Sequence, residues 1–100
     1  MQVVWLNSAV NDLVRLREFI AKHNPTAANK AAQKLITAAK TLEEHPELGK
    51  PVKDLPMYRD LGIKFGLRGY VLRYRIYENG LYVVHLRHYR ESGFRNTDQE

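Results

Sequence analysis

Residues 70–89 read YVLRYRIYENGLYVVHLRHY, and this stretch predicts two β-strands joined by a tight turn. Successive side chains of a strand point to opposite faces, and apolar and basic residues alternate in both halves of the stretch. Asn79-Gly80 lies between the halves, and this dipeptide favours two-residue hairpin turns because both residues tolerate positive φ. The pattern therefore predicts an antiparallel hairpin with strands over 70–77 and 81–89.

The alternation divides the hairpin side chains between an inner, apolar face and an outer, basic face. The inner face is expected to hold Tyr70, Leu72, Tyr74, Ile76, Tyr82, Val84, Leu86 and His88. The outer face is expected to hold Arg73, Arg75, Tyr77, Val83, His85, Arg87 and Tyr89. Pairing of the strands would gather the basic side chains on one open face of a sheet. This face is therefore the first candidate for a functional site.

The chain carries a net charge of +5, and the excess is concentrated around the hairpin. Residues 64–95 contain seven basic and two acidic side chains. A clustered basic surface favours polyanions or acidic protein partners, through steering and counterion release. The alternative is a solvated surface that only keeps the protein soluble. The length of 100 residues predicts a single domain over 1–100, with a polar C-terminal tail over about 90–100.

Several classes of protein are disfavoured by what the sequence lacks. There is no cysteine, and no His/Asp/Glu cluster has the spacing of metal ligands, so we expect no disulfide, no metal and no cofactor. No apolar stretch approaches the ~18 residues of a membrane span, and the N-terminus lacks the layout of a signal peptide. The sequence predicts a cytoplasmic protein without a membrane partner.

Two helices are expected in the first half of the chain. Ser8 or Asn7 is predicted to cap the first, which would end at about His23. Its apolar stripe is Ala9, Leu13, Leu16 and Ile20, with Asp12 among the residues on other faces. Asn24-Pro25 would begin the second helix, which runs to about Glu44. Its stripe is Ala28, Ala31 or Ala32, Leu35, Ala38 or Ala39, and Leu42, and so many alanines favour an antiparallel helical hairpin.

Further strands are expected on both sides of the helical hairpin. Residues 2–6 predict a short strand with Trp5 as a core anchor. After a loop over 47–56, residues 58–65 predict a strand whose outer row would bring Lys64 to the basic face. The order is β-α-α-β-β-β. It predicts an α+β fold in which an N-terminal strand precedes an antiparallel helical hairpin packed on a mostly antiparallel β-sheet.

This layout and its motifs resemble the ParE branch of the RelE/ParE superfamily of bacterial toxin–antitoxin toxins. The resemblance covers nearly the whole chain. It is carried by Trp5, Ala9-x-x-Asp12-Leu13, Asn24-Pro25, the stretch from Leu42-Glu43-Glu44-His45-Pro46 to Gly49-Lys50-Pro51, Arg59-Asp60-Leu61, the stretch from Gly69-Tyr70 to Arg75-Ile76, and His88-Tyr89-Arg90. No single motif is specific, but the combination is.

The resemblance implies one of two activities on one fold. ParE-like toxins are understood to inhibit DNA gyrase by trapping it on cleaved DNA, and they are not catalysts. RelE-like relatives are ribosome-dependent mRNA endonucleases. In either case the resemblance implies a cognate, ParD-like antitoxin, and binding of operator DNA only through that antitoxin. A third possibility is a degenerate relative that is no longer toxic.

The residues at the nuclease positions favour gyrase inhibition. RelE-like enzymes place an arginine directly after the residue that matches Tyr70, and this chain has Val71 there. Arg90 could serve as their arginine beyond the last strand, but Phe94 and Arg95 occupy the region of their tyrosine. The set is incomplete, so we expect no enzyme. If the protein were a nuclease, its catalytic residues would be Arg90, His88 and Arg73.

Two groups of contact residues are predicted from this resemblance and from the faces described above. The target is expected to bind Lys64, Arg73, Arg75, His85, Arg87, Tyr89 and Arg90. The antitoxin is expected to bind a groove on the first helix that includes Leu16, Phe19 and Ile20. Ordinary core packing is the alternative for these three residues.

Overall fold

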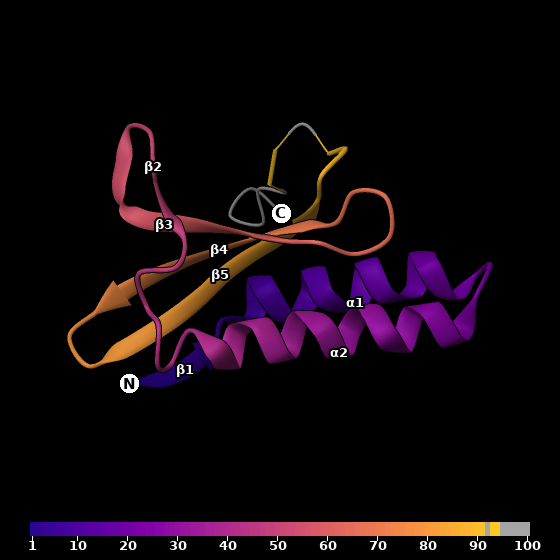
Figure 1. The fold of residues 1–100 in the computed structure, drawn as a ribbon, viewed down its shortest axis with the longest axis horizontal. Helices are drawn as coiled ribbons and strands as arrows, with labels where there is room; N and C mark the ends of the chain where they lie inside the picture. Colours follow the sequence, from indigo (N-terminus) through magenta and orange to yellow (C-terminus); the bar gives the residue numbers. More distant parts are fainter. Residues whose placement is uncertain (92, 95–100) are drawn as a thin grey trace.

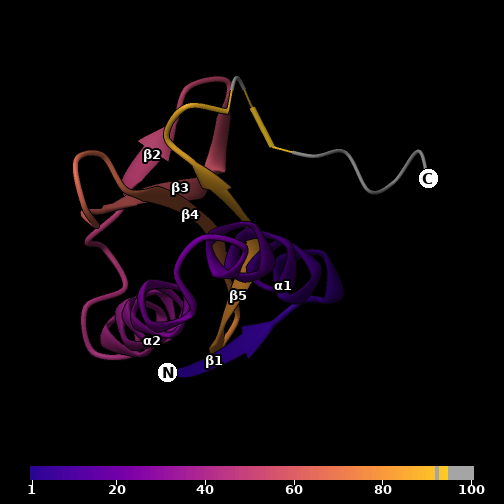
Figure 2. The ribbon, with the colours of Figure 1, turned by 90° about the vertical axis from the view of Figure 1, so that its right-hand side faces the viewer.

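The computed structural model describes residues 1–91 and 93–94. Its elements are β1 (Gln2–Trp5), α1 (Asn7–Ala21), α2 (Pro25–Thr41), β2 (Lys50–Val52), β3 (Leu55–Ile63), β4 (Tyr70–Tyr77) and β5 (Gly80–His88). The two helices cover one face of a five-stranded sheet, as Figures 1 and 2 show. The predicted fold class is therefore confirmed. Among the described residues, no helix is long and apolar enough to cross a membrane.

The strands lie in the order β1-β5-β4-β3-β2. β1 pairs in parallel with β5, and the other neighbours are antiparallel. The prediction of a loop over 47–56 was wrong, because it contains β2 and the start of β3. Pro51 suggested a loop, yet a proline is tolerated in β2 because this strand lies at the edge of the sheet. β3 ends at Ile63, so Lys64 lies just beyond the strand.

A β-bulge in β5 reverses part of the predicted alternation. Arg73 lies opposite His85, but the next residue, Tyr74, lies opposite Val83, so Val84 is the additional residue. Val83 is consequently buried, while Tyr82 and Val84 are only partly buried. The inner positions predicted for Tyr82 and Val84, and the outer position of Val83, were wrong. One extra residue in a strand reverses the face to which the side chains before it point. From His85 onward, the side chains of β5 point to the faces that the alternation predicts.

The helical hairpin follows the predicted stripes closely. Asn24 caps α2 through its Oδ1, which accepts a hydrogen bond from the Ala27 N–H at 3.0 Å. The residues of the second stripe that are buried are Ala28, Ala31, Leu35, Ala39 and Leu42. α1 and α2 run antiparallel side by side, as Figure 1 shows. The many small side chains permit this close approach.

The start of α1 differs from the prediction. The N-cap residue is Leu6, and no side chain caps the helix, so neither Ser8 nor Asn7 has the expected role. Ser8 instead donates its hydroxyl hydrogen to the Val84 carbonyl oxygen at 2.6 Å. Leu6 N donates to the Val83 carbonyl oxygen at 3.0 Å. These two bonds tie the start of the helix to β5. Trp5, just before, packs against the core as expected.

Tyr74 is the centre of the core and fixes the segment after α2. Its hydroxyl donates to the Pro46 carbonyl oxygen at 2.6 Å and accepts from the Gly49 N–H at 2.9 Å. A Cβ atom at residue 49 would lie 2.7 Å from a carbon of the tyrosine ring, so only glycine fits. Burial raises the pKa of the Tyr74 hydroxyl, which therefore keeps the proton that it donates.

We expect Tyr74→Phe to lower the free energy of unfolding by about 1–3 kcal/mol, because the variant leaves the Gly49 N–H and the Pro46 carbonyl without their partner. Urea denaturation followed by circular dichroism measures the change. Tyr77→Phe is the matched control, since this ring is 53% exposed and its loss of a hydroxyl should change stability by less than about 0.5 kcal/mol. Equal stability of the two variants would contradict the role of the Tyr74 hydroxyl.

Candidate functional site

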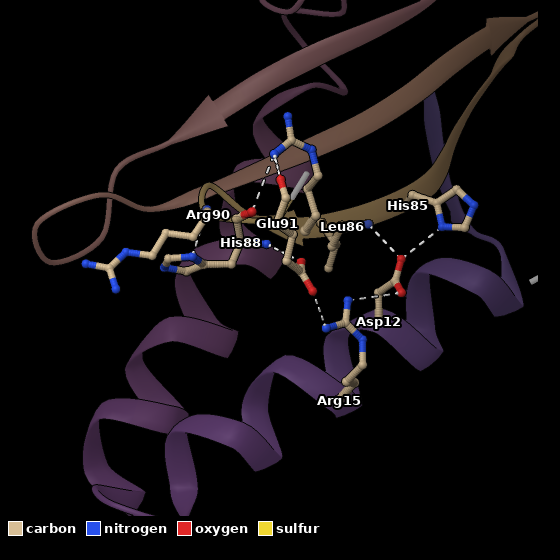
Figure 3. A network of polar contacts seen from close by, with 8 residues as sticks. Asp12, Arg15, His85, Leu86, His88, Arg90 and Glu91 are labelled. Atoms are coloured by element: carbon tan, nitrogen blue, oxygen red, sulfur yellow. Dashed lines mark hydrogen bonds and ion pairs between the residues drawn. The ribbon is translucent and has the colours of Figure 1, made fainter. Parts of the chain in front are cut away.

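A polar network joins α1 to the second half of β5 (Figure 3). β1 pairs only with Gly80–Val83, so the later backbone N–H groups on this edge of β5 need other partners. Asp12 Oδ2 accepts from the Leu86 N–H at 2.9 Å and lies 2.9 Å from His85 Nδ1. Glu91 Oε2 accepts from the His88 N–H at 2.7 Å. Two carboxylates thus replace the missing neighbouring strand.

Arg15 connects these two carboxylates. Its NH1 donates to Glu91 Oε1 at 2.7 Å, and its NH2 lies 3.5 Å from Asp12 Oδ1. Asp12 is only 2% exposed, so its expected place among the residues outside the buried stripe was wrong. The spacing of Ala9, Asp12 and Leu16 along one side of a helix was the signal for burial. The pairing with a strand edge had no signal in the sequence.

We expect Asp12→Ala to lower the free energy of unfolding by about 1–3 kcal/mol, because it leaves the Leu86 N–H buried without an acceptor and removes the partner of His85. Thermal and urea unfolding check this. Glu18→Ala is the control on the same helix, since Glu18 is exposed. A loss of stability no larger for Asp12→Ala than for Glu18→Ala would show that the carboxylate does not hold the strand edge.

The outer face of the sheet brings Arg73, His85 and Arg87 together, as the alternation predicts. The ring of Phe94 covers them, at 4.5 Å from the Arg73 guanidinium carbon and 5.2 Å from that of Arg87. The His85 and Phe94 ring centroids are 5.6 Å apart. We name these four residues the Phe94 cluster. Residues 92 and 95–100, including Arg95 and most of the predicted polar tail, lie outside the described residues.

Each polar side chain of the Phe94 cluster is engaged within the protein. Arg73 makes a bidentate pair with Asp60, with Nε and NH2 donating at 2.8 and 3.0 Å. Arg87 NH1 donates to the Glu91 carbonyl oxygen at 2.9 Å, and His85 contacts Asp12. The role of Asp60 was missed, although its position on the outer row of β3 was the available signal. The mutual repulsion expected of clustered arginines is relieved by this carboxylate.

His88 and Arg90 lie on the other side of the sheet, at the end that meets α1. His88 stands opposite Tyr70, and the two rings pack edge to face with centroids 5.3 Å apart. His88 Nδ1 accepts from the Arg90 N–H at 3.0 Å. The structure therefore does not bring His88 and Arg90 together with Arg73, the third residue of the expected nuclease set. Among the other predicted target residues, Lys64 and Tyr89 are exposed.

An apolar groove of about 640 Å³ lies between α1 and the loop that connects β3 to β4. Its apolar wall is formed by Leu16, Phe19, Ile20, Phe65, Leu67 and Tyr70. Its charged and polar rim is formed by Arg15, Arg68, His88, Arg90 and Glu91. All three residues predicted to contact an antitoxin line this groove. Leu16 belongs to the hydrophobic core and Ile20 packs against it, so core packing describes these two residues. Phe19 is 67% exposed and Leu67 is 98% exposed, so their side chains are open to a partner.

Arg75 lies apart from the other predicted target residues. It is on the outer face of β4 near the hairpin turn, with its guanidinium carbon 5.9 Å from the ring centroid of Tyr58 and 5.2 Å from that of Tyr77. Among residues 1–91 and 93–94, no group of three or more acidic, histidine or cysteine side chains could hold a metal ion. The candidate surfaces are thus the groove, the Phe94 cluster and the surroundings of Arg75.

Comparison with known proteins places this chain in a family. A family model described as the ParE toxin of the type II toxin–antitoxin system parDE matches residues 3–93. The chain belongs to the ParE toxin family. It is a toxin of the ParE/RelE type from a type II toxin–antitoxin system, and such a system implies an antitoxin partner.

Relatives of this ParE-family toxin carry RelE names. It is 36% identical over 87 residues to Toxin RelE2 of Caulobacter vibrioides, covering 87% of this chain and 93% of that one. It is 34% identical over 80 residues to Toxin RelE3 of the same organism, covering 80% and 85%. A solved structure of the chromosomal ParDE TA system from P. aeruginosa matches 88% of this chain and 95% of its own, with a TM-score of 0.76 and 20% identity. That likeness concerns the fold alone.

Proposed function

We propose that this ParE-family toxin arrests growth by inhibiting DNA gyrase, without catalysing a reaction itself. The observation that supports this proposal most strongly is the bidentate pair of Arg73 with Asp60. Cleavage of RNA requires cations that stabilise the negative charge developing on the phosphate. Arg73 already neutralises a carboxylate, and Val71 supplies no charge beside it. The Phe94 ring also lies over this part of the sheet.

The second candidate is a ribosome-dependent mRNA endonuclease, and the names of the Caulobacter vibrioides relatives favour it. On this chain such an enzyme would use Arg90, His88 and Arg73. Two of these line the groove beside α1, and Arg73 is on the outer face of the sheet. A single scissile phosphate could not contact all three in this arrangement, which is why we prefer gyrase.

The test compares both activities in one preparation of toxin freed of antitoxin. We expect loss of supercoiling by purified gyrase together with an accumulation of cleaved plasmid, and reversal of both by the antitoxin. A reconstituted translation reaction with a reporter mRNA, read by primer extension, is expected to give intact transcript. Normal supercoiling together with translation-dependent cleavage would establish the endonuclease instead.

We also propose that an apolar segment of the antitoxin occupies the groove between α1 and the β3–β4 loop. The groove has a buried floor that includes Leu16 and Tyr70, and the exposed side chains of Phe19 and Leu67 stand at its opening. An amphipathic helix with acidic residues on its flanks fits such a surface, because Arg68 and Arg90 stand on the rim. Operator DNA is then contacted by the antitoxin, not by the toxin.

We expect Phe19→Glu to weaken antitoxin binding at least about tenfold, because it places a charge in the apolar wall of the groove. Isothermal titration calorimetry with the purified antitoxin measures the affinity. Val14→Glu is the matched control, since Val14 is an exposed residue of the same helix that does not line the groove. Unchanged affinity of Phe19→Glu would place the antitoxin elsewhere on the toxin.

A further inference from the structure

A second hollow, of about 390 Å³, lies on the outer face of the sheet near the β4–β5 turn. Its described lining consists of Leu6, Tyr58, Arg75, Tyr77, Tyr82 and Val84. We name it the Arg75 hollow. Arg75 lies on a central strand, and Tyr58 of β3 and Tyr82 of β5 both stand directly opposite it. The bulge in β5 is what places Tyr82 on this face, because Val84 shifts the preceding residues by one position.

Arg75 differs from Arg73 and Arg87 in that no side-chain hydrogen bond holds its guanidinium within residues 1–91 and 93–94. Arg73 is paired with Asp60, and Arg87 donates to backbone carbonyl groups. Within residues 1–91 and 93–94, no hydrogen bond or ion pair involves the Arg75 guanidinium, and its Nε is buried without a partner. A buried Nε–H group without an acceptor is costly, and a ligand that supplies an acceptor relieves that cost.

The aromatic rings hold this guanidinium in place. Its carbon lies 5.2 Å from the centroid of Tyr77 and 5.9 Å from that of Tyr58, both within the range of cation–π interactions. Tyr77 is 53% exposed, so part of this aromatic surface remains open to a partner. An arginine that is already oriented loses less conformational freedom when it binds, so the hollow is prepared for a planar anionic group.

The composition of the hollow identifies the class of partner. Arginine and tyrosine are, with tryptophan, enriched in the energetically dominant parts of protein–protein interfaces. A surface that follows a nucleic-acid backbone needs several cations in a row, and Arg75 is the only cation among the described lining residues. A carboxylate matches the paired N–H groups of one guanidinium, and the surrounding rings and Leu6 suit apolar neighbours of that carboxylate.

We propose that the Arg75 hollow binds an acidic side chain, flanked by apolar residues, on the protein that the toxin inhibits. This inference rests on the proposed function, so the partner is DNA gyrase. The hollow is on the helix-free face of the sheet, whereas the groove proposed for the antitoxin is lined by α1. The two partners would therefore contact different surfaces of the toxin.

The experiment measures binding of immobilised gyrase to the toxin freed of antitoxin, by biolayer interferometry. We expect Arg75→Glu to weaken binding by roughly 30-fold or more, because it places like charges in contact at a desolvated site. Tyr77→Ala, an exposed change at the end of β4, is expected to weaken binding by about tenfold. Lys34→Glu is the matched control, since it makes the same change of charge on the exposed side of α2 and should leave binding unchanged.

The outcomes separate this inference from the function on which it rests. The wild-type toxin could bind and inhibit gyrase while Arg75→Glu and Tyr77→Ala have no effect on binding. That result would overturn the inference and leave the proposed function intact. No binding of the wild-type toxin to gyrase would overturn both. The circular dichroism spectrum serves as the measure of folding for each variant. A loss of antitoxin affinity in both folded variants would overturn the inference and assign the hollow to the antitoxin. Binding of a thymidine oligonucleotide by the wild-type toxin and Lys34→Glu, but not by these two variants, would overturn it and assign the hollow to nucleic acid.

Discussion

The fold depends on one constraint: the second half of β5 has no neighbouring strand on the side where β1 pairs with its first half. β1 pairs with only the first half of this strand, and backbone N–H groups beyond Val83 would otherwise be left without acceptors. Asp12 and Glu91 supply the acceptors, and Arg15 lies between the two carboxylates. Because Asp12 belongs to α1, the same contact that completes the sheet also places this helix against it. The position of α1 then determines one wall of the apolar groove.

A single irregularity in β5 has comparable consequences for the outer face. The bulge at Val84 turns Tyr82 outward beside Arg75, and it turns Val83 into the core. Beyond the bulge, His85 and Arg87 face outward with Arg73 and lie under Phe94. The face is thereby divided into a cluster whose polar side chains already have partners and a hollow whose arginine makes no hydrogen bond or ion pair within residues 1–91 and 93–94. A uniformly alternating strand would have produced one continuous basic surface.

Charge alone therefore says little about which residues meet a partner. Arg73 and Arg75 are separated by one residue on the same strand and face the same side, and the sequence offers no reason to distinguish them. Across the sheet, Arg73 meets Asp60 while Arg75 meets Tyr58. An arginine bound to a carboxylate is part of the scaffold, whereas one held between rings can receive an anion. The residue that stands opposite each arginine on the neighbouring strand therefore determines whether its guanidinium is available to bind a partner.

The sequence by itself determined the elements whose signals are local. Asn24 as a cap, the alanine stripe of α2 and the alternation of β4 each depend on neighbouring residues, and together they predicted the fold class. The predicted Asn79-Gly80 turn was wrong by one residue, because Glu78 and Asn79 form the turn and Gly80 already pairs with Tyr77. The tertiary structure alone decided the pairing of Asp12 with the edge of β5, the strand character of 50–52, the face on which Tyr82 lies and the partner of each arginine. Each of these depends on a residue brought close by pairing or packing of distant segments. Local periodicity carries no information about such partners, because the free energy that selects them is gained only when the distant segments meet.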